Sequence, residues 1–459
     1  PTGALTVSNC RFIENHANNG TGGFGGAIYA TDTTGTLTIL DCVFNRNTSW
    51  NTGGAIYIIE STELVVDRCV FSGNAPLQGG FSGGGAIRTH NTPSQILNSA
   101  FVGNWAHDQG GSLMFVGPYH ANVVNCTLYR TESNSTWDAI FTTGGSLTLR
   151  NSILWNWTNE IYDGGSAIIA ENNIISNGYA GNSSANPLFA YAISSTWTSV
   201  ASYDAATCST TLTQNSLRWQ PNEFAGMFVR PNTVNREAYY ILSNTSDSLT
   251  VLGDASSVGL SIFEILRPTL IGGSPAIDAA NGAFATTRDI RNRVRYDDPN
   301  IVGLSAADLG AYERRIHFVD DAASGANDGS DWANAYTDLQ DALAAASAGE
   351  EIWVAAGTYK PTDGADRMVS FGIGGMVELY GGFSGTETTN AERDTRDWRA
   401  NFTLLTGDLN GDDAGLMNNS ENSYNVVRMS DYALISGFFI RGGKDRKSTR
   451  LNSSHGKLS

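Results

Sequence analysis

Charged residues are scarce in this chain, and basic ones are the scarcer kind. Charged side chains make up 16% of its 459 residues, whereas an average soluble domain has roughly 25%. The 28 Lys and Arg residues are outnumbered by 45 Asp and Glu, which gives a formal net charge of −17. Because phosphate backbones are bound by clustered Lys and Arg, this balance argues against a nucleic acid as partner.

Long apolar runs are missing as well. No stretch of about 18 or more consecutive apolar residues occurs, so the sequence predicts no transmembrane helix. The chain begins at Pro1 and shows no signal peptide, which says nothing about the natural start of the protein. Residues 445–459 resemble the conceptual translation of a sequencing-library adapter. We therefore expect this tail to be an artefact and not part of the natural protein.

Glycine is plentiful, with 51 residues, and much of it falls within a repeat. The repeat places two apolar residues two positions apart, then a small residue three positions later, then an apolar residue after two more. Three clear copies are Leu5, Val7, Cys10, Phe12; Leu37, Ile39, Cys42, Phe44; and Leu64, Val66, Cys69, Phe71. Weaker copies follow, and the seventh is predicted at Ala167, Ile169, Asn172 and Ile174. Such fixed self-similarity is typical of a solenoid.

The step of three positions within each copy predicts a bend. Side chains two apart share one face of a strand, so a step of three would turn the next side chain away from the core. The residue before the small position is Asn9, Asp41, Arg68, Asn98, Asn125 or Asn151 in the first six copies. Asn and Asp tolerate the left-handed backbone conformation that a sharp bend needs, and Arg68 is the exception.

Two further features complete the repeat. An asparagine stands three positions after the phenylalanine, at Asn15, Asn47, Asn74 and Asn104. A glycine pair then opens another strand, as in Gly25-Gly26-Ala27-Ile28. Each copy therefore holds three short strands separated by turns, and copies stacked with strands about 4.8 Å apart form a parallel β-helix.

The Gly-Gly-Ala-Ile and Phe-x-x-Asn elements resemble the repeat of polymorphic outer membrane proteins and of related proteins in the pectate-lyase-like superfamily. The resemblance covers about residues 1–176. It implies an all-β fold, a right-handed parallel β-helix, and a bacterial protein that is extracellular or associated with the cell surface or outer membrane. It does not imply catalysis.

Cysteines recur at one position of the repeat, and serine replaces them in other copies. Cys10, Cys42, Cys69 and Cys126 share that position with Ser99. Neighbouring Cβ atoms in such a stack would lie near the strand spacing of about 4.8 Å, beyond the roughly 3.5–4.5 Å that a disulfide prefers. We therefore predict free, buried thiols, and Cys208 lies outside the repeat.

The organisation changes twice along the chain. Residues 1–189 are predicted to be the C-terminal part of a first β-helix, residues 190–268 a small antiparallel β insert for lateral binding or packing, and residues 269–315 the closing segment. Residues 316–444 would hold a capping helix and the start of a second β-helix. The helix is predicted from the helical spacing of Trp332, Tyr336, Leu339 and Leu343 and the alanine-rich run to Ala348. The second β-helix is predicted from Ala433, Ile435, Phe438 and Ile440, which restore the repeat spacing with Gly437 at the bend.

Two glycine motifs match known functional patterns but are interpreted as turns. Gly20-x-Gly22-x-x-Gly25 fits a dinucleotide fingerprint, and Gly80-x-Ser82-x-Gly84 fits a nucleophile elbow. Neither lies between a predicted strand and a predicted helix, which both chemistries require. We therefore expect no organic cofactor.

The strongest metal candidate is an aspartate-rich loop. Asp408, Asn410 and Asp412 offer oxygen ligands at alternating positions, which suits Ca²⁺. The loop departs from an EF-hand at its sixth position, Asp413, and at its twelfth, Asn419. The alternative is a polar loop between rungs. Asp297-Asp298 and Asp320-Asp321 are weaker candidates, and the six histidines show no metal-ligand pairing and are expected at the surface.

Catalysis on this fold would need clustered carboxylates, joined in a lyase by an Arg or Lys near the sugar. Asp41 and Arg68 are instead interpreted as an ion pair between neighbouring rungs. The leading hypothesis is a non-enzymatic scaffold, adhesin-like or glycan-contacting, whose partner is a cell-surface glycan or a host or matrix protein. The alternative is a polysaccharide lyase or glycoside hydrolase. Tryptophans near the turns are candidates for stacking on sugars: Trp50, Trp105, Trp137, Trp155 and Trp157.

Overall fold

The structure is a computed structural model that describes residues 3–18, 22–78, 83–130, 132–133, 138–155, 159–295, 307–414 and 417–444. Several positions singled out from the sequence lie outside these residues: Gly20, residues 80–82, Trp137, Trp157, Asp297-Asp298, and the tail 445–459 with His455. The chain divides into two compact units, Pro1–Arg315 and Ile316–Ser459. Each unit is described by itself.

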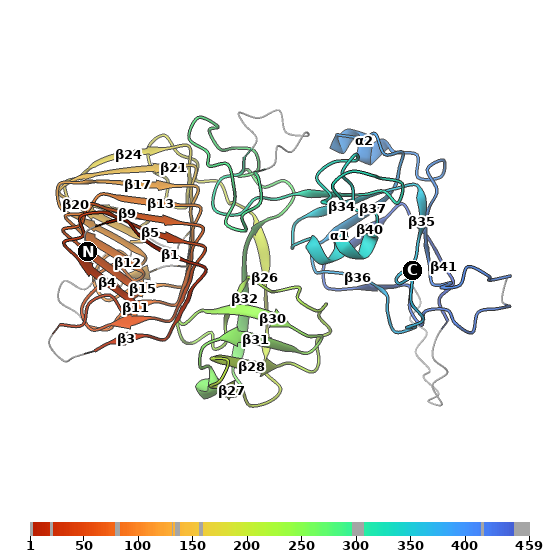
Figure 1. The fold of residues 1–459 in the computed structure, drawn as a ribbon, viewed down its shortest axis with the longest axis horizontal. Coiled ribbons are helices and arrows are strands. Elements are labelled where there is room, and N and C mark those ends of the chain that lie inside the picture. The colour runs from red at the N-terminus through yellow and green to blue at the C-terminus, as the bar shows by residue number, and fades with distance from the viewer. Residues whose placement is uncertain are drawn as a thin grey trace. The chain divides into compact units, whose positions relative to one another are not determined.

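The first unit contains the predicted parallel β-helix, built from three stacked parallel sheets (Figure 1). The first sheet holds β1 (Leu5–Ser8), β5 (Thr36–Leu40), β9 (Glu63–Asp67), β13 (Ser94–Leu97), β17 (His120–Val124), β21 (Ser146–Arg150) and β24 (Ala167–Glu171). The second sheet holds β2 (Arg11–Ile13), β6 (Val43–Asn45), β10 (Val70–Ser72), β14 (Ala100–Val102), β18 (Thr127–Tyr129), β22 (Ile153–Trp155) and β25 (Ile174–Ile175). Both are seven-stranded, as seven repeats require.

The third sheet follows the glycine pairs. It holds β4 (Ile28–Thr31), β8 (Ile56–Ile59), β12 (Ile87–His90), β16 (Leu113–Val116), β20 (Ile140–Thr143) and β23 (Ile161–Asp163). Short strands lie between the second and third sheets: β3 (His16–Ala17), β7 (Thr48–Ser49), β11 (Ala75–Pro76), β15 (Trp105–Ala106) and β19 (Glu132–Ser133). The core runs through the coil, where Phe12, Phe44, Phe71 and Phe101 stack ring on ring with centroids 4.6, 4.7 and 4.8 Å apart.

The predicted bend is confirmed in the first six rungs, and the seventh rung bends at Asn172. The bend residues have positive φ angles of 44° to 58°: Asn9, Asp41, Arg68, Asn98, Asn125, Asn151 and Asn172. The register of the seventh rung was predicted wrongly. Leu149 pairs with Ala170 and Leu154 pairs with Ile175, so Ile168, Ala170 and Ile175 face the core. A one-residue slip reverses every side chain of a strand, and the bend at Asn172 sets the true register.

The glycine pairs have two separate causes. The first glycine takes a left-handed conformation, with φ of 54° at Gly25 and 60° at Gly53. The second lies against the next rung, because a Cβ on Gly26 would fall 2.3 Å from the carbonyl oxygen of Gly54. Neither position tolerates a side chain without displacing the backbone.

Side-chain ladders tie the rungs together. The amide oxygen of Asn47 accepts from the backbone nitrogen of Asn15 at 3.1 Å, and that of Asn74 accepts from the backbone nitrogen of Asn47 at 2.9 Å. All five cysteines are free, as predicted. Cys42, Cys69 and Cys126 are buried, but Cys10 is exposed, so the expectation of burial was wrong for that residue.

The insert forms an antiparallel sheet of seven strands. They are β26 (Phe189–Thr196), β27 (Ser202–Asp204), β28 (Ser209–Thr213), β29 (Phe228–Arg230), β30 (Tyr239–Asn244), β31 (Ser248–Leu252) and β32 (Ile262–Leu270), with a 3-10 turn η1 (Ser256–Val258). Phe228 and Leu266 pack against Val70 and Val102, which lie on the outer face of the second sheet of the first β-helix. The insert therefore covers an apolar face of the coil.

The second unit begins another parallel β-helix. One sheet holds β33 (Ile316–Val319), β34 (Glu351–Ala355), β37 (Glu378–Phe383) and β40 (Leu434–Ser436); the others hold β35 (Gly357–Tyr359), β38 (Thr403–Thr406) and β41 (Phe439–Arg441), and β36 (Phe371–Ile373) and β39 (Val427–Met429). Gly437 has φ of 82°, which confirms the predicted bend. The capping helix α1 (Leu339–Ala345) buries Leu339 and Ala342 in the core.

Two predictions about helices need correction. Helix α1 starts later than Trp332, because Asp338 caps its first turn by accepting a hydrogen bond from the backbone nitrogen of Gln340. A second helix, α2 (Asn390–Thr395), was missed, although Thr389 and Glu392 form a capping box that the sequence displays. Both helices are short.

Candidate functional site

An open groove of about 620 Å³ runs across the turns between the third and first sheets of the first unit. It spans neighbouring rungs, with Asp32 on one rung, Glu60 on the next, Asn91 on the third and Tyr119 on the fourth. The groove is largely open to solvent and does not enclose a ligand as a small-molecule pocket does. Its lining consists of Asp32, Thr33, Thr34, Glu60, Ser61, Thr62, Asn91, Pro118 and Tyr119.

A second column of left-handed residues forms one wall of the groove. Asp32, Glu60 and Asn91 have φ angles of 52°, 50° and 49°, and Gly117 continues the column at 108°. The left-handed residue comes directly after a strand and points its side chain outward. Asp32 and Glu60 are therefore exposed. Carboxylates on successive rungs therefore face solvent along the same line.

Hydroxyl groups make the floor of the groove rigid. The backbone nitrogen of Ser61 donates to the hydroxyl of Thr92 at 3.1 Å, and the backbone nitrogen of Thr33 donates to the hydroxyl of Ser61 at 3.4 Å. Thr33 and Ser61 are buried, whereas Thr34 and Thr62 beside them are exposed. The inner hydroxyls thus hold the turns in register, and among the outer ones Thr62 also donates to the carbonyl oxygen of Thr33 at 2.9 Å.

Tyr119 supplies the only aromatic ring among the described residues that line the groove, and half of its surface is exposed. Lys and Arg are absent from this lining, so the groove carries negative charge without a compensating cation. A tyrosine ring offers an apolar face and a polar tip, which suits a ligand that is apolar on one face and hydroxylated at its edge.

Sequence reasoning missed this groove, although a signal for it exists. Asp32, Glu60 and Asn91 each stand six positions after the second glycine of a pair, Gly26, Gly54 and Gly85. Extending the repeat alignment past the glycines would have placed them in one column. Of the predicted tryptophans, the three that the structure describes do not line the groove: Trp50 and Trp105 are half-buried elsewhere, and Trp155 packs near the closing segment.

The predicted metal loop is the second candidate site. Asp408 and Asp412 come together with Glu421, and one carboxylate oxygen of each lies within 4.8 Å of the others. Asn410, the third predicted ligand, is exposed in the same loop. Glu421 was missed because it lies two positions beyond Asn419, where an EF-hand has its last ligand.

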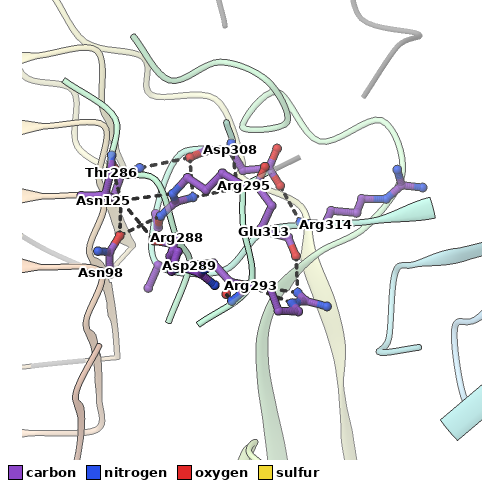
Figure 2. Close-up of polar contacts among 12 residues, drawn as sticks. Asn98, Asn125, Thr286, Arg288, Asp289, Arg293, Arg295, Asp308, Glu313 and Arg314 are labelled. Atoms are coloured by element: carbon purple, nitrogen blue, oxygen red, sulfur yellow. Dashed lines mark hydrogen bonds and ion pairs between the residues drawn. The ribbon is translucent and has the colours of Figure 1, made fainter. Parts of the chain in front are cut away.

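The most densely bonded polar cluster surrounds Arg295, in the closing segment (Figure 2). Its guanidinium donates to Glu313 Oε2 at 2.7 Å, to the carbonyl oxygen of Gly310 at 2.9 Å and to Asn98 Oδ1 at 3.1 Å. Asp308 accepts backbone hydrogen bonds from Asp278 and Arg314 at 2.9 and 2.7 Å. Burial, with nearby Asp278 adding to the effect, raises the pKa of Asp308 to about 7.

The contacts around this cluster hold the closing segment on the coil. The bend residues themselves bind the closing segment: Asn125 accepts from the backbone nitrogen of Thr286 at 3.1 Å (Figure 2), and Asn151 accepts from that of Asn281 at 2.8 Å. The side chains of the bend column thus have a second role that the repeat alone does not reveal. They attach the described parts of the closing segment, residues 276–295 and 307–314, along the coil.

Two smaller predictions can be compared with the structure. Arg68 Nε lies 2.8 Å from Asp41 Oδ1, which confirms the ion pair between rungs. His317, expected at the surface, is buried and lies 2.9 Å from Glu350 Oε2. That contact involves one histidine and one carboxylate, so it does not make a metal centre.

The fold defines the chain as a protein of two tandem parallel β-helices. No family model, curated protein or solved structure matches it. Within the described residues, no helix is long and apolar enough to cross a membrane. The groove and the acidic loop are therefore interpreted from their own chemistry.

Proposed function

We propose that the chain is a non-enzymatic, secreted or cell-surface β-helix scaffold that binds a glycan in the groove between Asp32 and Tyr119. The single observation that carries the proposal is this groove of about 620 Å³, which crosses successive rungs and is lined by hydroxyl, carboxylate and amide groups beside an exposed tyrosine ring. Sugars combine hydroxyl edges with apolar ring faces, so these groups complement them.

The charge of the groove narrows the class of glycan. Asp32 and Glu60 are exposed carboxylates, and no basic side chain accompanies them in the lining that the structure describes. An acidic polysaccharide such as pectate would be repelled. A neutral glycan, with hydroxyls that donate hydrogen bonds to the carboxylates, is the ligand that the groove favours.

The stacked rungs also suit display. Backbone hydrogen bonds join each rung to the next, and the asparagine, hydroxyl and aromatic columns repeat that connection in the side chains. A ligand lying along the stack would meet equivalent turns at regular spacing of about 4.8 Å. Such a surface binds a chain of sugars without needing to move.

Hydrolysis is a second candidate, and one observation favours it. Asp32 and Glu60 stand on neighbouring rungs of the same groove, and glycosidases use two carboxylates flanking the scissile bond. A general acid needs a raised pKa, which usually comes from burial, and both side chains are exposed. This exposure supports binding over catalysis.

The experiment is a binding assay of the full chain against a panel of neutral and acidic polysaccharides, with release of reducing ends measured in parallel. We expect retention on a neutral polysaccharide, loss of most of it in Tyr119→Ala, and no reducing ends. Tyr191→Ala is the matched control, because Tyr191 is 59% exposed and belongs to the insert. Equal retention by both variants would refute the groove as the glycan-binding site. Release of reducing ends that Glu60→Gln abolishes would instead establish the hydrolase.

A further inference from the structure

The acidic cluster of the second unit, defined as Asp408, Asp412 and Glu421, lies in the connection between β38 and β39. Its carboxylate oxygens approach within 4.8 Å of one another, and like charges at this distance repel. Among the described residues, none of the three carboxylates has a cationic partner. Lys360 and Lys444 reach this loop but donate to neutral oxygens of Leu409 and Asn419, at 2.9 and 2.6 Å.

A separate observation concerns buried oxygens beside the cluster. Asn422 is 1% exposed, and its amide nitrogen donates to Asp413 Oδ2 at 2.8 Å, while the backbone nitrogen of Asp413 donates to Asp408 Oδ2 at 3.1 Å. The side chain of Asn422 is thus linked through Asp413 to Asp408, the first residue of the cluster.

Three oxygens in and beside the cluster accept no hydrogen bond within the described residues. Asn422 Oδ1, Asp413 Oδ1 and Glu421 Oε1 are buried and accept no hydrogen bond. Buried acceptors without a partner are rare in native proteins, because moving a polar group out of water without a new hydrogen bond costs free energy. The like charges of the cluster and these oxygen acceptors together form a donor set that suits a cation.

We propose that this loop binds a calcium ion through the carboxylates of Asp408, Asp412 and Glu421, joined by the buried side-chain oxygen of Asn422. All four donors are hard oxygens, and Ca²⁺ takes six to eight oxygens, water included, at about 2.3–2.6 Å in irregular geometry. Mg²⁺ demands a near-ideal octahedron and keeps several waters, and Zn²⁺ prefers nitrogen and sulfur ligands. The ion binds residues near both ends of the connection between β38 and β39, and so holds these two ends together.

The variants follow from the contacts. Asp412 is exposed, and its backbone nitrogen and carbonyl oxygen make its hydrogen bonds within the described residues, so Asp412→Asn removes a ligand charge and keeps these bonds. Glu421→Gln is the second variant. Asp363→Asn is the matched control, because Asp363 is an exposed aspartate in the same unit and outside the cluster.

The test is isothermal titration of the EDTA-treated full chain with CaCl₂, in a buffer with a severalfold excess of Mg²⁺ over protein. We expect one site with a Kd tighter than about 1 mM, within the range of extracellular calcium modules, and a loss of about tenfold or more in Asp412→Asn and Glu421→Gln. The control variant should match the parent chain. Absence of calcium heat in the parent chain, an unchanged Kd in both ligand variants, or displacement of calcium by the Mg²⁺ present would each overturn the assignment.

Discussion

Arg295 donates a hydrogen bond to the side chain of Asn98 at 3.1 Å, and so joins a buried cation of the closing segment to a bend of the β-helix 197 positions earlier in the chain. The same guanidinium pairs with Glu313 at 2.7 Å, and both side chains are almost fully buried. The closing segment is therefore attached to the coil by a hydrogen bond from a buried guanidinium, and the charge of that guanidinium is balanced within the segment by Glu313.

Removing one partner of this pair is expected to destabilise the first unit strongly. Glu313→Gln leaves the Arg295 charge buried without its counter-ion, which should lower the free energy of unfolding by about 3 kcal/mol. Urea unfolding, followed by labelling of the buried thiols of the first unit, measures this change.

The control for that change is Glu171→Gln. Glu171 pairs with Arg150 at 3.0 Å, but its side chain is 53% exposed. A surface pair of this kind contributes less than about 1 kcal/mol. Equal losses in the two variants would show that burial of the Arg295 pair does not matter.

The asparagine ladder should show a gradient from its interior to its end. Asn74→Ala leaves the backbone and side-chain nitrogens of Asn47 without their acceptor and the carbonyl oxygen of Phe44 without its donor. Each unpaired buried group costs about 1–3 kcal/mol, so we expect a loss of about 3 kcal/mol or more. Asn15 is exposed, and Asn15→Ala should cost less than about 1 kcal/mol by the same urea assay.

Burial raises the pKa of Cys126 to about 12. In the unfolded chain the pKa of this thiol is about 8.5. At pH values between the two pKa values, the folded state therefore binds one more proton than the unfolded state. The stability that the neutral thiol contributes is complete below about pH 8.5 and is lost as the pH rises toward 12. Circular dichroism of urea unfolding at several alkaline pH values measures the loss.

Cys126→Ser provides the comparison, since Ser99 and Ser152 occupy the same position in neighbouring rungs. Without an ionisable group there, the fall in stability per pH unit should be smaller by about 1.4 kcal/mol within this window. An unchanged slope would mean that Cys126 does not account for the alkaline loss.

Much of the first β-helix could be predicted from the sequence, because each rung repeats the same local requirements. The bend at Asn9 and its equivalents follows from the step of three positions, and the free thiols follow from the strand spacing. The predicted register of the seventh rung was displaced by one residue, since the apolar pairs Ile168-Ile169 and Ile174-Ile175 allow two registers and only the left-handed Asn172 distinguishes them.

The sites were harder to predict because they depend on contacts between distant segments. The groove needs turns from successive rungs, and its exposed carboxylates carry no apolar pattern that marks them. The closing segment contacts Asn98 and Asn125 through side chains that local reasoning had already assigned to bends. At the acidic loop, two of three predicted ligands belong to the cluster, and Glu421 arrives by folding back beside Asp408.

Hydrogen exchange of the full chain, with and without the polysaccharide that it retains best, tests the proposed glycan groove most directly. We predict slower exchange in peptides covering residues 32–34, 60–62 and 118–119, which line the groove, and unchanged exchange in the insert around Tyr191. Protection confined to other surfaces, or no protection by any retained polysaccharide, would contradict the account.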